Sequence, residues 1–133
     1  MRGTSLRTRR YTLSVAQNAP QPESADLTTP QGVHARRADV QIVDVREPYE
    51  WEAGRIDDSH HIPLNRLMAG PTADIDAARP VVCVCRSGNR SELASVMLRA
   101  RGLDAYNMQG GLEAWEQAGL PLSTPDGRPG RVA

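Results

Sequence analysis

The 133-residue chain holds only two thiols, Cys83 and Cys85, which stand two residues apart. A disulfide across a single intervening residue would be strained. The three histidines do not lie at a spacing that would complete a zinc site with these cysteines. The sequence therefore predicts free thiols, no bound metal and no cofactor. Reduced thiols are typical of the cytoplasm, and a thiolate is a strong nucleophile.

The residues that follow Cys85 are of types that stabilise a charged sulfur: Arg86, Ser87, Gly88, Asn89 and Arg90. Gly88 can take backbone dihedrals closed to other residues, so that successive amide N–H groups turn inward around an anion. The positive end of a following helix, with the two arginines, favours the thiolate over the thiol. We expect Cys85 to be the catalytic residue and the five loop residues to bind its substrate. For Arg86, a solvated side chain pointing out of the loop stays an open alternative.

Other polar and sulfur-bearing residues are expected to have structural roles. Cys83 lies inside an apolar run and should pack in the core. Asp44 and Arg46, at the end of another apolar run, are predicted to form an ion pair that supports nearby loops. Nothing in the sequence places His60 or His61 next to the sulfur, so neither is predicted to be its general base.

The elements that must position Cys85 alternate between short β-branched runs and helical patterns, which is typical of a parallel sheet covered by helices. Strands are predicted at 41–45, 81–84 and 104–108, with a short extended piece at 60–64. Cys85 directly follows the unbroken apolar run 81–84, which reads as a central strand. Ligands of open α/β sheets gather at the carboxyl ends of the strands, which is where this cysteine stands.

Helices are predicted at 29–37, at 47–54, from Ser91 to Arg101 and after the Gly110-Gly111 turn, with weaker helical turns within 65–79. Thr29 and Pro30 are a typical N-cap and first residue. Trp51 is expected in the core, and Gly54 is expected to end its helix in a left-handed conformation. The helix from Ser91 should bury a stripe formed by Leu93, Val96, Met97 and Ala100.

Together these patterns predict a single α/β domain at residues 26–122, with a mostly parallel sheet of about five strands and helices on both faces. Residues 1–25 are expected to be a disordered tail and residues 123–133 a flexible one. The arginine-rich start is not followed by an apolar run of signal-peptide length, and no stretch would span a bilayer. With 16 basic and 16 acidic residues, neither nucleic acid nor a membrane is an expected partner.

Four segments resemble the rhodanese family in the order in which that family has them. They are the Cys-x-x-Gly-x-Arg motif at 85–90, Asp44-Val45-Arg46-Glu47, the stretch from Gly54-Arg55-Ile56 to His61-Ile62-Pro63-Leu64, and Gln109-Gly110-Gly111-Leu112-Glu113-Ala114-Trp115. The resemblance covers about residues 27 to 122. Its departures are Arg55, where the family often has His, and Asp57-Asp58 in place of a Pro-Gly turn.

The resemblance implies a thiosulfate sulfurtransferase that holds a persulfide on Cys85. The implied partners are a small anionic sulfur donor such as thiosulfate, an acceptor such as cyanide or a thiol, and a sulfur-accepting protein in some settings. Two alternatives stay open. One is a non-catalytic docking module of the same fold. The other is an arsenate reductase or phosphatase, although relatives with that chemistry have a loop one residue longer.

Overall fold

A four-stranded parallel sheet forms the centre of the computed structural model, which describes residues 24–70 and 74–133. The strands stand in the order β2-β1-β3-β4, and every neighbouring pair is parallel. Their bounds are β1 Gln41–Asp44, β2 His60–His61, β3 Val81–Val84 and β4 Ala105–Asn107. The predicted α/β class is confirmed. The disordered tail predicted at 1–25 lies, up to residue 23, outside the described residues.

The predicted count of about five strands is wrong for the described part of the chain, which forms four. Arg55 and Ser123 make an isolated antiparallel bridge near the carboxyl-terminal segment. Pro121 and Pro125 flank Ser123 at two residues' distance on either side. Because proline has no backbone N–H to donate, such a segment does not extend into a strand.

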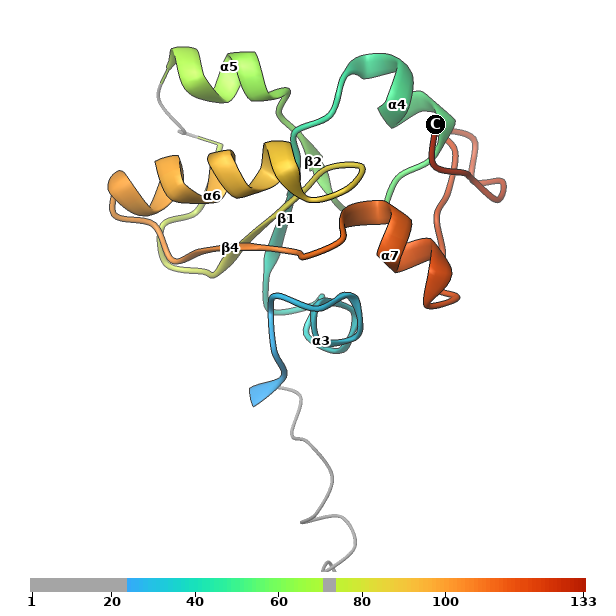
Figure 1. Ribbon diagram of the computed structural model, residues 1–133, viewed down its shortest axis with the longest axis horizontal. Coiled ribbons are helices and arrows are strands. Elements are labelled where there is room, and N and C mark those ends of the chain that lie inside the picture. Colours follow the sequence, from blue (N-terminus) through green and yellow to red (C-terminus); the bar gives the residue numbers. More distant parts are fainter. Residues whose placement is uncertain (1–23, 71–73) are drawn as a thin grey trace, which may run out of the picture.

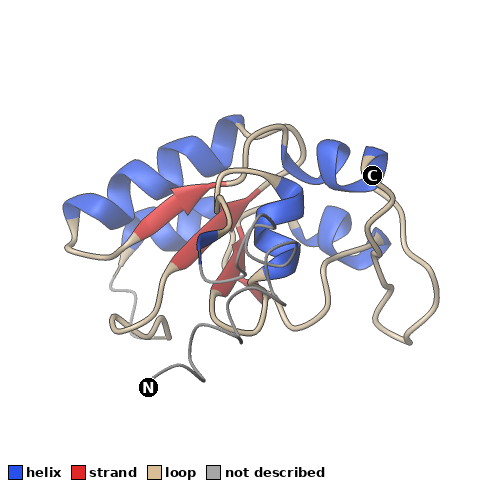
Figure 2. Cartoon of the chain, turned by 90° about the horizontal axis from the view of Figure 1, so that it is seen from below, coloured by secondary structure: helices blue, strands red, loops and turns tan. Residues whose placement is uncertain are grey.

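In the described part of the chain, helices cover both faces of this sheet (Figures 1 and 2). One apolar layer lies between the sheet and the pair α5 and α6, and a second layer includes α3 and α7. No helix in the described ranges is long and apolar enough to cross a bilayer. The bounds are α3 Pro30–Ala35, α4 Pro48–Ala53, α5 Leu64–Ala69, α6 Asn89–Ala100 and α7 Gly111–Gln117.

Strand β3 is the central element that positions the cysteine loop. All four of its residues are fully buried, with Val82 and Val84 packed in one layer and Val81 and Cys83 in the other. Burying a valine side chain on such a strand contributes roughly 1.5–3 kcal/mol. The prediction of a strand buried on both faces is confirmed, and Cys85 follows at its carboxyl end.

Helix α6 buries a different face from the one that the sequence predicts. Leu93 and Val96 of the predicted stripe are 46% and 47% exposed. The buried residues are instead Ser91, Ala94, Ser95 and Leu98. Two positions along a helix correspond to about 200° of rotation, so this face is nearly opposite to the predicted one. The buried hydroxyls are tolerated because each has a partner, as with Ser95, whose Oγ donates to the Glu92 carbonyl at 2.8 Å.

The carboxyl-terminal segment, for which a flexible tail is predicted, is hydrogen-bonded to the domain in the structure. The Arg131 amide donates to the Ala53 carbonyl at 3.0 Å, and Ser123 exchanges backbone hydrogen bonds with Arg55 at 2.9 and 3.0 Å. Gly54, between these contacts, is extended (φ 167°) rather than left-handed as predicted. A Cβ on Gly54 would lie only 2.5 Å from the Arg131 backbone, so the close approach of the segment requires glycine.

Candidate active site

Cys85 is surrounded by hydrogen-bond donors that the loop and the start of α6 direct at its sulfur. The Gly88 amide donates to Sγ at 3.1 Å, and the Ser91 amide donates at 3.4 Å. The Ser91 hydroxyl donates from 3.3 Å, and the Ser87 amide is a further donor. The residue is only 1% exposed, so the surrounding chain covers almost all of it.

The backbone conformation of Gly88 makes this arrangement possible. Gly88 has a φ of 103° and forms the N-cap of α6, a conformation that side-chain-bearing residues rarely adopt. A Cβ at this position would also lie 3.2 Å from the Gly110 amide nitrogen. The loop can therefore curl under the sulfur, as the sequence predicts from the glycine.

Ser91 is a site residue that the sequence reasoning assigned only to a helix start. Its hydroxyl contacts Cys85 Sγ and also donates to the Asn107 Oδ1 at 2.6 Å. The Nδ2 of Asn107, the last residue of β4, donates to the Gly88 carbonyl at 3.1 Å. Asn107 is thus hydrogen-bonded both to Ser91, which donates to the sulfur, and to Gly88 of the loop. Ser91 could have been found from the sequence, because it carries a hydroxyl and directly follows the motif that ends at Arg90. Asn107 lies on a distant strand, and nothing in the sequence points to it.

The two cysteines differ in their acid–base properties. Burial would raise the pKa of the Cys85 thiol, but the hydrogen bonds from the Ser91 hydroxyl and from the Ser91, Gly88 and Ser87 amides outweigh it, so this pKa lies below its ordinary value. Burial raises the pKa of the Cys83 thiol to about 12. Cys85 is therefore the candidate nucleophile, and Cys83 is a packed core residue.

Arg90, in the first turn of α6, does not point freely into the loop. Its two terminal nitrogens donate to the two carboxylate oxygens of Glu50 at 2.8 and 2.9 Å. Glu50 is buried in α4, and this hydrogen bonding with Arg90 holds the pKa of its carboxyl below the ordinary value. The same bond raises the pKa of Arg90. The sequence reasoning missed Glu50, because nothing in the spacing joins residues 40 positions apart.

Arg86 and Asn89 lie at the outer rim of the loop. The Arg86 side chain is 55% exposed, and its Nε donates to the Glu113 carboxylate of α7 at 3.1 Å. Asn89 is exposed as the first residue of α6. Of the five predicted loop residues, Ser87 and Gly88 thus supply donors to the sulfur, while Arg86 takes the outward orientation that the sequence left open.

Asp44 and Arg46 form the predicted ion pair, completely buried, at the carboxyl end of β1. Arg46 donates to both Asp44 oxygens and also to the Gly54 carbonyl at 2.7 Å. The pair therefore links the end of β1 to the end of α4, the helix that carries Glu50. Its role is to fix the elements around the loop.

The histidines and Trp51 lie in a separate cluster. The Nε2 of His61 donates to the Arg46 carbonyl at 2.8 Å, and its ring stacks on Trp51 with centroids 4.7 Å apart. His60 is exposed. Trp51 is half-buried with Arg55 over its ring, so the prediction of a core anchor is wrong for this residue. The fully buried tryptophan is Trp115 of α7.

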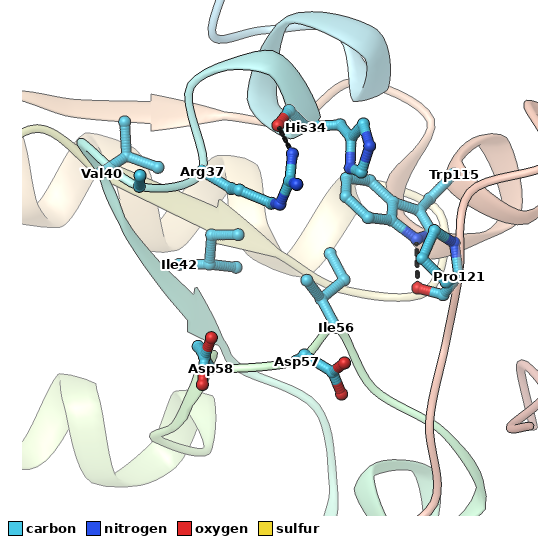
Figure 3. Close-up of a pocket in the computed structure, with 10 residues that line it drawn as sticks. His34, Arg37, Val40, Ile42, Ile56, Asp57, Asp58, Trp115 and Pro121 are labelled. Atoms are coloured by element: carbon cyan, nitrogen blue, oxygen red, sulfur yellow. Dashed lines mark hydrogen bonds between the residues drawn. The ribbon is translucent and has the colours of Figure 1, made fainter. Parts of the chain in front are cut away.

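A hollow of about 400 Å³ lies in the apolar layer away from the cysteine loop (Figure 3). Val40, Ile42 and Ile56 line it with Trp115, and Asp57 and Asp58 lie on the opposite side from the guanidinium of Arg37. No cysteine, serine or threonine lines it. Among the described residues, its walls therefore hold no thiol or aliphatic hydroxyl nucleophile, and Cys85 defines the candidate active site.

The structure thus combines a parallel sheet with a cysteine at the end of its central strand, and backbone amides donate to the sulfur of that cysteine. These features define a class of cysteine-dependent α/β proteins. The rhodanese-like domain model matches residues 29–118, so the chain belongs to the rhodanese-like family. A protein named thiosulfate sulfurtransferase GlpE from Pseudomonas syringae is 36% identical over 107 residues, which are 80% of this chain and 92% of that protein.

Two further proteins are similar to this chain. A crystal structure of a rhodanese-related protein from Thermoplasma volcanium has a TM-score of 0.67 and 28% identity, covering 71% of this chain and 93% of the other. An uncharacterized protein from Synechocystis is 41% identical over 83 residues, which are 62% of this chain and 46% of that longer protein. The similarity therefore extends over the whole four-stranded domain.

Proposed function

We propose that this protein is a sulfurtransferase that carries a sulfane sulfur atom as a persulfide on Cys85. The observation that carries the proposal is the convergence of amide and hydroxyl donors on one cysteine sulfur whose pKa is lowered. The name of the Pseudomonas relative, thiosulfate sulfurtransferase, supports the same chemistry. A thiolate held in this way is prepared to attack an electrophilic sulfur.

In the first half-reaction, the Cys85 thiolate attacks the outer sulfur of thiosulfate. A new S–S bond forms, the S–S bond of thiosulfate breaks, and its electron pair leaves with sulfite. The products are a Cys85 persulfide anion and the sulfite dianion, so charge and atoms balance. The Gly88 and Ser87 amides and the Ser91 hydroxyl would stabilise the negative charge on the sulfur atoms.

In the second half-reaction, a thiophilic acceptor removes the outer sulfur. Cyanide attacks that sulfur, the Cys85 S–S bond breaks, and its electron pair returns to Cys85 as thiolate while thiocyanate leaves. A thiol acceptor would take the sulfur in the same way and become a persulfide. The lowered pKa of Cys85 makes it a good leaving group in this step.

The geometry of the arginines favours a sulfur ligand over a tetrahedral oxyanion. Only four residues separate Cys85 from Arg90, and both terminal nitrogens of Arg90 are bound to Glu50. A site for phosphate or arsenate needs a guanidinium whose N–H groups are free to bind the oxygens of the ligand. We therefore expect no turnover of arsenate or of an aryl phosphate.

The deciding experiment measures thiocyanate formed from thiosulfate and cyanide, with Cys85→Ser as the inactive control and Cys83→Ser as the active one. Intact mass should show one added sulfur atom after thiosulfate treatment, lost again with cyanide. No sulfur on Cys85 and no thiocyanate formed would refute the proposal and favour a docking module. Equal activity in Cys85→Ser would refute the role of Cys85. We place this activity in the cytoplasm, where thiols such as Cys83 and Cys85 stay reduced.

A further inference from the structure

The charged side chains at the cysteine loop are paired so that their charges cancel locally. Arg86 is paired with Glu113 and Arg90 with Glu50, and the buried Arg46 nearby is paired with Asp44. Each of these cations therefore has a carboxylate within 3.1 Å. A donor that approaches Cys85 meets hydrogen-bond donors aimed at the sulfur but little net positive charge.

We propose that Glu113 is a specificity-determining residue that shifts donor choice away from dianions such as thiosulfate and towards singly charged sulfane donors, such as thiosulfonate anions and persulfides. This inference rests on the proposed sulfurtransferase function. Attraction to a site scales with the charge of the ligand. A second negative charge on the donor must then approach a thiolate beside arginines that, in the part of the chain that the structure describes, are already paired with carboxylates.

Glu113 is held beside Arg86 by the backbone as well as by the ion pair. Its amide donates to the Arg86 carbonyl at 3.0 Å, and the neighbouring Leu112 amide donates to the Cys85 carbonyl at 2.8 Å. The start of α7 lies so close to the loop that only glycine fits at position 111, because a Cβ there would lie 2.5 Å from the carbonyl oxygens of Cys85 and Arg86. The start of α7 therefore keeps the carboxylate of Glu113 at the rim of the loop.

The singly charged donor reacts by the same balanced step. The Cys85 thiolate attacks the terminal sulfur of methanethiosulfonate, a new S–S bond forms, and the bond between that sulfur and the sulfonyl sulfur breaks. Its electron pair leaves with methanesulfinate, giving a Cys85 persulfide anion. Methanethiosulfonate is thiosulfate with one charged oxygen replaced by a methyl group, so the two donors form a nearly isosteric pair that differs in charge.

The first test compares these two donors with the wild-type protein. Each kcat/KM is divided by the rate constant for the uncatalysed reaction of that donor with a simple alkyl thiol. We expect the corrected value for thiosulfate to be no higher than that for methanethiosulfonate, and to depend little on ionic strength. A higher corrected value for thiosulfate that falls steeply with added salt would overturn the inference, because it would reveal net positive charge at the site.

The second test uses Glu113→Gln, which leaves Arg86 without its partner. At an ionic strength of about 0.01 M, we expect kcat/KM to rise about two-fold for methanethiosulfonate and about four-fold for thiosulfate, since the dianion feels the added charge twice. The matched control is Glu116→Gln. Glu116 is an exposed glutamate one turn further along α7 with no ion pair in the described part of the chain, and we expect the donor ratio to stay unchanged there.

These outcomes separate the inference from the function on which it rests. An unchanged donor ratio in Glu113→Gln, with both donors active, would overturn the role of Glu113 and leave the sulfurtransferase intact. Equal ratio changes in both variants would also overturn it, because the effect would then be one of net charge. Failure of both donors to load Cys85 in the wild-type protein would refute the proposed function and the inference together.

Discussion

The Ser91 hydroxyl has one hydrogen and two acceptors, the Cys85 sulfur at 3.3 Å and the Asn107 Oδ1 at 2.6 Å. A thiolate is the stronger competitor for that hydrogen, whereas a thiol can itself donate to the Ser91 oxygen. The hydroxyl can therefore serve both protonation states of the sulfur by turning about its C–O bond. This makes Ser91 the residue through which the charge of the sulfur is most directly tuned.

Replacing Ser91 with alanine should raise the pKa of the Cys85 thiol, because a donor to the thiolate is lost. Hydrogen bonds to charged groups contribute about 1.5–3 kcal/mol, so sulfur transfer near neutral pH should fall roughly ten-fold. Activity rises with pH as the thiolate forms, and the rise should move to higher pH in Ser91→Ala. The pH profile of thiol alkylation measures this, and Ser91→Thr should retain the wild-type profile. A profile unchanged in the alanine variant would contradict the role of Ser91.

Glu50 should link the stability of the fold to acid. Because its folded pKa lies below the ordinary value of 4.5, the stabilisation is present above that pH and is lost as the pH falls through the folded pKa. Glu50→Gln should cost roughly 1–2 kcal/mol at neutral pH, a reduced figure because Arg90 is partly hydrated. The loss of stability should shrink as the pH falls below 4.5. Urea unfolding of both proteins across this pH range tests the claim, and a pH-independent difference would contradict it.

At the same scale, the candidate site was predictable where its residues are contiguous. Cys85 and Gly88 lie in one short loop, and a glycine between a buried strand and a helix indicates inward amides from sequence alone. The partners of the loop come from elsewhere, with Glu50 in α4 and Asn107 in β4. Such pairings depend on tertiary packing, which spacing in one sequence does not encode.

At the scale of elements, α6 illustrates where hydrophobic pattern fails. Leu98 is fully buried, whereas Leu93 on the same helix is 46% exposed. The helix packs its short residues Ala94 and Ser95 towards the core, which lets it approach the sheet closely. The predicted stripe was drawn through apolar residues alone, whereas two of the four buried residues are serines, Ser91 and Ser95.

The two leucines of α6 make a matched pair for testing this orientation. Leu98→Ala should cost about 3 kcal/mol of unfolding free energy, because it removes buried apolar area and leaves a cavity. Leu93→Ala should change stability by no more than about 0.5 kcal/mol, as exposed positions usually do. Chemical denaturation of the two variants measures the difference. Equal costs would mean that the helix faces the other way.

The strands were better predicted than the helix faces. The runs 41–44 and 81–84 contain two and three β-branched residues, and their parallel pairing follows from the helices between them. The fifth strand was expected from typical sheet sizes rather than from a particular run of residues. No fifth β-branched run that would form this strand was predicted from the sequence.

For the molecule as a whole, the carboxyl-terminal segment is part of the folded domain. Its backbone bonds to Ala53 and Arg55 hold it against the end of α4, the helix that carries Glu50. Sequence reasoning called this segment flexible because it is rich in proline and polar residues. Its attachment uses backbone groups, which composition does not reveal.

Gly54→Ala should therefore destabilise the domain by about 1–3 kcal/mol, because the added methyl group would overlap the Arg131 backbone. Gly70→Ala is the matched control, since a Cβ there would meet nothing within 4 Å. We also expect faster tryptic cleavage after Arg131 in Gly54→Ala, as the segment detaches. Thermal unfolding and limited trypsin digestion check both effects. Identical behaviour of the two variants would show that the attachment contributes nothing to stability.

The burial of Cys83 has a consequence for oxidative damage. The side chains of Cys83 and Cys85 lie in the same apolar layer. Side chains two apart on an extended strand are parallel, with Cβ atoms about 6.6 Å apart, whereas a disulfide needs roughly 3.5–4.5 Å. The pKa of about 12 keeps the Cys83 thiol protonated. If a peroxide converts Cys85 to a sulfenic acid, no second cysteine in the chain can resolve it. Recovery then depends on small thiols from solution reaching a sulfur atom that is almost entirely enclosed.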